Sequence, residues 1–148
     1  MPTQTLIYSL GYLGLVPFLV TLLALISGQT WFQIDNSRLF GTYSAVILSF
    51  LGGVLWGRSI SLNSQAAKYL FLFSNGIALL AWLSLLLVEA FSSITLGLLI
   101  TGYAALLLTE YVGYQRFLKD VDKGYLTMRI NLTSLVILAH LIALPYFN

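Results

Sequence analysis

Long apolar runs alternate with short polar segments along the whole chain. The five runs cover residues 6–26, 39–57, 69–88, 91–109 and 130–147. Each is close to the ~20 helical residues that cross a hydrocarbon core about 30 Å thick. Backbone amides in lipid need partners within the chain, and these Leu- and Ile-rich runs lack the alternation of barrel strands. The pattern therefore predicts an all-α, polytopic membrane protein, a bundle of five transmembrane helices that forms one domain over residues 1–148.

The connection after the fourth run has a helical pattern of its own. Over residues 111–125, apolar side chains recur at helical spacing and charged side chains fill the opposite face; the apolar members are Tyr114, Phe117, Leu118, Val121 and Tyr125. This pattern is typical of a short amphipathic helix on the cytoplasmic surface, or of an extension of the fourth span. A solvated connecting helix fits it equally.

Basic residues are unevenly distributed between the two ends of the predicted bundle. Five spans place the termini on opposite sides, and Arg38 is the one basic residue on the side of the C-terminus. The other side carries Arg58, Lys68, Arg116, Lys119, Lys123 and Arg129. Since Lys and Arg accumulate in cytoplasmic loops, we expect a cytoplasmic N-terminus and a periplasmic C-terminus.

The aromatic residues and the N-terminal segment agree with this placement. We interpret eight aromatic residues as anchors at the two interfaces: Tyr8, Trp56, Tyr69 and Tyr111 on the cytoplasmic side, and Trp31, Phe32, Tyr43 and Tyr146 on the outer side. Residues 1–5 lack the Lys or Arg of a signal peptide, and the chain shows no Arg- and Ser-rich transit segment. We therefore expect a multi-pass protein of the bacterial inner (plasma) membrane.

The amino-acid composition argues against several classes of function. Only 8% of the residues are charged, against roughly 25% in soluble domains, and 59% are hydrophobic. A net charge of +2 gives no nucleic-acid footprint. The chain has no Cys and a single His, which argues against a metal site or a cofactor of its own. No catalytic triad, phosphate loop or paired carboxylates within the spans are present, so we expect a protein that is not an enzyme.

The second apolar run carries a stripe of small residues. Gly41, Ala45, Ser49, Gly53 and Gly57 follow one another at steps of four, Gly52 widens the stripe, and Trp56 flanks it. Residues four apart share a helix face, so we expect a continuous groove along this span. Small residues let helix backbones approach closely in lipid. The groove would serve packing within the chain or docking of a separate membrane protein.

Three segments carry a resemblance to a known family. They are residues 10–18 (LGYLGLVPF), 43–57 (YSAVILSFLGGVLWG) and 125–133 (YLTMRINLT). Together they resemble the family called domain of unknown function 3429, which comprises small membrane proteins like transmembrane protein 69. The resemblance implies a small helical protein of an inner membrane, and it implies no reaction. The chain departs from the family pattern at Glu110, where Asp is expected, and at Gly124, where Trp is expected.

Pro17 lies near the middle of the first apolar run. It removes an amide donor and should kink the helix, which leaves the carbonyl of Leu13 in need of another partner. The kink is either a packing feature or a hinge.

His140 is the one ionisable side chain placed deep in an apolar run. Burial of such a group is costly, which makes it a candidate for function. A neutral imidazole bonded to a neighbouring helix is the structural alternative, with Tyr103 and Thr101 as candidate partners. If the chain holds a ligand, we expect its pocket to be lined by Trp82, Tyr103 and His140.

Three charged residues end spans on the cytoplasmic side. Arg58 ends the second span, Glu110 ends the fourth and Arg129 opens the fifth. A lone carboxylate near hydrocarbon is costly, so we expect Glu110 to pair with Arg58 or Arg129. Three separate side chains reaching to water are the alternative.

These features favour a non-catalytic membrane protein whose partners are the lipid bilayer and other membrane protein subunits. In this interpretation it is an accessory or assembly subunit that packs against a larger inner-membrane complex. The alternative is a binder or transporter of a small apolar molecule such as a lipid or quinone.

Overall fold

The computed structural model describes residues 3–28, 33–62, 64–116 and 123–147, which form helices and short turns and no β-strand. The elements are α1 (Thr3–Leu13), α2 (Leu15–Ser27), α3 (Asn36–Ser59), α4 (Gln65–Leu87), α5 (Ser92–Arg116), α6 (Lys123–Ala143) and the 3-10 turn η1 (Leu144–Tyr146). Within the described residues, five helical stretches are long and apolar enough to cross a membrane, and α1 with α2 forms the first of them. The predicted all-α bundle with five spans is confirmed.

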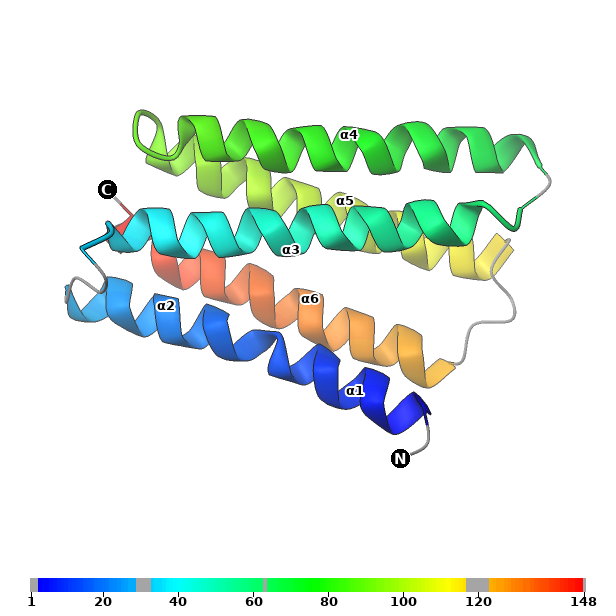
Figure 1. The fold of residues 1–148 in the computed structure, drawn as a ribbon, viewed down its shortest axis with the longest axis horizontal. Helices are drawn as coiled ribbons and strands as arrows, with labels where there is room; N and C mark the ends of the chain where they lie inside the picture. Colours follow the sequence, from blue (N-terminus) through cyan, green and yellow to red (C-terminus); the bar gives the residue numbers. More distant parts are fainter. Residues whose placement is uncertain (1–2, 29–32, 63, 117–122, 148) are drawn as a thin grey trace.

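Helix α3 holds the bundle together. It packs against α2, α4 and α5, while α5 also contacts α4 and α6, and α6 contacts α1 and α2. Figure 1 shows these helices running along one common axis, with the two chain termini at opposite ends. Two glycines permit close approach: a Cβ on Gly52 would lie 3.1 Å from the backbone oxygen of Ser74 on α4, and one on Gly102 would lie 2.6 Å from Leu48 Cδ2.

The stripe of small residues does not form one continuous groove. Gly41 and Ala45 are buried, Ser49 is half-buried, and Gly53 and Gly57 have no atom within 4 Å of an added Cβ. The expectation was wrong because a step of four residues rotates about 40° around a helix with 3.6 residues per turn. Over four such steps the stripe turns by about 160°, from the core to the outer face.

The buried small residue at the level of Gly53 is its neighbour Gly52. Trp56 is exposed, and its ring packs edge-on against Phe71 of α4.

The connection between α5 and α6 includes residues 117–122, which lie outside the described part of the chain. The predicted segment 111–125 begins as a continuation of α5, which ends at Arg116, and it ends within α6, which starts at Lys123. Its early part is therefore the predicted extension of the fourth span. The fifth span is also longer at its start than the apolar run of 130–147 indicated.

The first span is broken near its middle, as Pro17 predicted. The break lies at Gly14, between α1 and α2, and the carbonyl of Gly14 accepts a 2.9 Å hydrogen bond from the Tyr43 hydroxyl. The sequence indicated that the Leu13 carbonyl would need another partner. The carbonyl that gains one is instead that of the next residue, Gly14. Tyr43 also packs edge-on against Phe18 at 4.9 Å between ring centroids. Its hydroxyl therefore caps the kink inside the bundle, and the interpretation of Tyr43 as an interfacial anchor was wrong.

Candidate functional site

His140 lies at the centre of the bundle in a polar contact that joins two helices. Its side chain is fully buried, and Nε2 lies 2.7 Å from the Ser44 hydroxyl of α3. Nδ1 lies 2.7 Å from the Val136 carbonyl, one turn earlier on α6. A carbonyl only accepts, so Nδ1 carries the proton. Burial among apolar side chains disfavours the charged imidazolium, so Nε2 is unprotonated and accepts from the Ser44 hydroxyl. The buried imidazole is therefore neutral, with both nitrogens satisfied.

The predicted pocket of three residues is assembled only in part. Tyr103 of α5 is buried beside His140, with ring centroids 5.6 Å apart, and its hydroxyl donates to the Ser44 carbonyl at 2.8 Å. Trp82 is 58% exposed on α4, so its place in the pocket was wrong. Thr101 is also exposed and donates to the Gly97 carbonyl of its own helix, which removes it as a partner of His140.

Ser44 is the residue that sequence reasoning missed. It bonds to His140 through its hydroxyl and to Tyr103 through its carbonyl, so α3, α5 and α6 meet at this one residue. The available signal was a hydroxyl at mid-depth of the second span. Phe18 and Phe40 close the cluster, at ring distances of 6.0 and 4.9 Å from His140.

A buried ion pair lies nearer one end of the bundle. Arg129 Nε donates to Glu110 Oε2 at 2.9 Å, and the two side chains are 6% and 4% exposed. Of the two arginines that the sequence offered to Glu110, the structure places Arg129 against it. Glu110 Oε1 and Arg129 Nη2 are buried and have no hydrogen-bond partner within the described residues.

Arg58 makes a different contact. Its guanidinium carbon lies 4.4 Å from the centroid of the Tyr125 ring, at the start of α6. This cation–π contact places Arg58 at the same end of the bundle as Arg129. At the opposite end, Arg38 pairs with Glu89 at 3.0 Å, and both side chains are mostly exposed.

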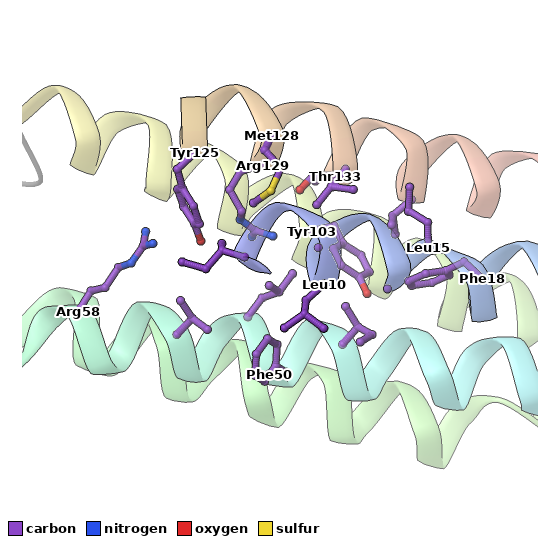
Figure 2. A pocket seen from close by; sticks show the side chains of 18 residues that line it. Leu10, Leu15, Phe18, Phe50, Arg58, Tyr103, Tyr125, Met128, Arg129 and Thr133 are labelled. Atoms are coloured by element: carbon purple, nitrogen blue, oxygen red, sulfur yellow. The ribbon is translucent and has the colours of Figure 1, made fainter. Parts of the chain in front are cut away.

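Arg58, Tyr125 and Arg129 form the polar end of a cavity of about 490 Å³ between the α1–α2 span, α3 and α6. Most of the lining is aliphatic or aromatic, and Tyr103 forms part of its floor. The volume falls within the range of about 300–1,000 Å³ for small-molecule sites. Figure 2 shows Arg58 and Tyr125 at one end of the cavity and Phe18 at the other.

The cavity has the length of one bilayer leaflet. The part of α3 that lines it, from Ile47 to Arg58, rises about 16 Å at 1.5 Å per residue. Half of a hydrocarbon core about 30 Å thick is nearly the same distance. An extended apolar chain fits this shape, with its polar end at the arginines.

The kink at Gly14 lies in the wall of the cavity. Helix α2 contacts both α3 and α6, whereas α1 packs mainly on α6, and Figure 1 shows α1 turning away from α3. The lining residues Leu10 of α1 and Phe50 of α3 are 58% and 64% exposed. The cavity is therefore bordered by two exposed apolar side chains on the side where α1 leaves α3.

Comparison with known proteins gives two matches of consequence. Residues 3–145 match the family described as "Protein of unknown function (DUF3429)", as the resemblance of three segments predicted. Transmembrane protein 69 of Xenopus tropicalis is 37% identical over 120 residues, which cover 76% of this chain and 47% of that protein. The chain thus spans about half the length of this curated relative. No solved structure matches it significantly.

Proposed function

The chain belongs to the DUF3429 family of membrane proteins, and from that premise we propose that it binds a membrane-soluble molecule with an apolar chain, without catalysis. The observation that carries this proposal is the cavity of about 490 Å³. The walls of this cavity are apolar over the length of one leaflet, and exposed side chains border it where α1 leaves α3. A molecule dissolved in the bilayer would reach it sideways, without passing through water.

The test is uptake of a neutral single-chain amphiphile. Protein in a neutral detergent is titrated with monoolein, and bound copies are counted by native mass spectrometry. We expect one saturable copy per chain. Val54→Phe enlarges a side chain that lines the cavity and should abolish this uptake. Val46→Phe on the same helix is the control, because Val46 is 55% exposed and lies outside the cavity lining. Equal uptake by both variants would refute the proposal.

A second candidate function is that of an accessory subunit of a larger membrane complex. The observation in its favour is the outer face of α3, where Gly53 and Gly57 leave open space beside the exposed Trp56. Small residues on a lipid-facing helix allow close approach of a partner helix. Oriented by its basic residues, the protein would lie in a bacterial inner membrane with Arg58 and Arg129 on the cytoplasmic side.

Affinity purification after mild solubilisation tests this second function. Gly53→Leu should lose a co-purifying membrane subunit that the unmodified protein retains. Gly76→Leu and Gly97→Leu are matched controls on α4 and α5, because both glycines also have open space around an added Cβ. Identical sets of co-purifying proteins for all three variants would speak against docking on α3.

A further inference from the structure

We infer that the molecule held in this cavity is a lipid with one net negative charge, whose phosphodiester is bound by Arg58 and Arg129. This inference rests on the proposed function and adds the chemical class of the ligand. Both arginines line the cavity at the end where its apolar walls stop. A headgroup whose acyl chain fills the cavity therefore lies beside both guanidinium groups.

At the mouth of the cavity, the charged side chains whose contacts the structure describes carry one net positive charge. The described charged side chains in contact there are Arg58, Arg129 and Glu110, and Glu110 neutralises one arginine. A phosphodiester without an ammonium group supplies the single negative charge that balances the set. A zwitterionic headgroup would bring an additional positive charge beside two arginines.

The guanidinium group of Arg129 is positioned to bind an anion. Its Nε is fixed by Glu110, the side chain is 94% buried in the bundle, and Nη2 has no hydrogen-bond partner within the described residues. An unpaired buried donor is costly to leave unsatisfied. Guanidinium groups bind phosphate oxygens through parallel N–H donors. A lipid phosphate oxygen beside Nη2 would satisfy the donor that Glu110 does not reach.

Arg58 completes the pair from the facing helix. The ring of Tyr125 lies 4.4 Å from its guanidinium carbon and restricts the side chain to the mouth of the cavity. Figure 2 shows Arg58 on α3 and Arg129 on α6, on the two sides of this mouth. The two arginines therefore approach a headgroup from opposite walls. The second acyl chain of a two-chain lipid would lie outside, against Leu10 and Phe50, both of which are exposed.

The experiment compares two lipids with identical chains. Protein in neutral detergent is titrated with dioleoyl phosphatidylglycerol or dioleoyl phosphatidylcholine, and bound lipid is measured by native mass spectrometry. We expect about tenfold tighter binding of the phosphatidylglycerol, the size of effect that charge-assisted hydrogen bonds supply. Inorganic phosphate at matched ionic strength should not displace it. Displacement would mean that the arginines bind free phosphate, which overturns the inference.

Variants distinguish binding of the lipid headgroup at this site from non-specific attraction between the lipid and the charges of the protein. Arg58→Gln should weaken phosphatidylglycerol about five- to tenfold and phosphatidylcholine less, because the ammonium group of phosphatidylcholine already opposes the contact of its phosphate with the arginines. Arg38→Gln, an exposed arginine at the other end, is the matched control and should change neither. The double variant Glu110→Gln/Arg129→Gln leaves no unpaired buried charge and should also reduce the preference. If Arg38→Gln acts as strongly as Arg58→Gln, the inference is wrong.

The failure of this inference is distinguishable from that of the proposed function. If both lipids bind equally and Val54→Phe abolishes the binding of both, the cavity binds lipid without distinguishing the charge of the headgroup. In that case the inference is wrong and the proposed function stands. If neither lipid nor monoolein binds saturably, the proposed function falls, and the inference falls with it.

Discussion

Glu110→Gln should destabilise the protein strongly, because it leaves the Arg129 charge without its counterion inside the bundle. The two side chains are 4% and 6% exposed, and one 2.9 Å hydrogen bond joins them. Removing one member of such a buried pair costs about 3–5 kcal/mol, since the remaining charge is desolvated and unpaired. The exposed pair of Arg38 and Glu89 at the other end contributes at most about 1 kcal/mol.

The double variant Glu110→Gln/Arg129→Gln separates pairing from packing. Replacing both charges removes the unpaired charge, so the loss should be smaller than the sum of the two single losses by about 2 kcal/mol or more. The assay is unfolding in a fixed detergent, followed by circular dichroism and analysed as a double-mutant cycle. A second cycle with Arg58→Gln is the control and should be additive, because Arg58 contacts the Tyr125 ring. Additive losses in the Arg129 cycle would refute the pairing argument.

Two further predictions concern the packing of the helices, and a third concerns the orientation in the membrane. Ser44→Ala removes the hydroxyl that donates to the buried imidazole of His140 and should lower the free energy of unfolding by about 1–3 kcal/mol. The same unfolding assay measures this loss, and an unchanged free energy would contradict the hydrogen bond. Gly52→Leu should prevent α3 from approaching α4 and destabilise the fold, whereas Gly53→Leu should leave thermal stability unchanged. A reporter active only outside the cytoplasm should work when fused after Phe147 and fail when fused after Leu62; the reverse pattern would invert the proposed orientation.

The number and type of spans could be predicted from the sequence because the constraint is local. A backbone in lipid must form helices, and each helix must be long enough to cross, so apolar runs suffice. The helix bounds were less accurate, since polar residues at helix ends escape a hydrophobic pattern. Helix α3 begins at Asn36 because the Asp35 side chain accepts from the Arg38 amide, a capping interaction that an apolar run does not record.

The contacts between helices could not be predicted in the same way. Which side chain meets His140 depends on the rotation of α3 and α6 about their axes, and the apolar pattern around a buried helix leaves that rotation undetermined. Thr101 and Ser44 were comparable donors by depth, and only the packed bundle turns Ser44 inward. The partner of Glu110 was easier to foresee, since a short connection and a costly charge left two arginines as alternatives.

The kink in the first span is a local feature that affects the arrangement of the whole bundle. Pro17 made a bend predictable, yet the bend lies at Gly14, where the Tyr43 hydroxyl takes the carbonyl. Because α2 stays on α3 while α1 leaves it, the bend separates the walls of the bundle at the level of one leaflet. The cavity lies where these walls separate. The bend that Pro17 predicted in the sequence thus contributes to the shape of the site that we propose for a lipid.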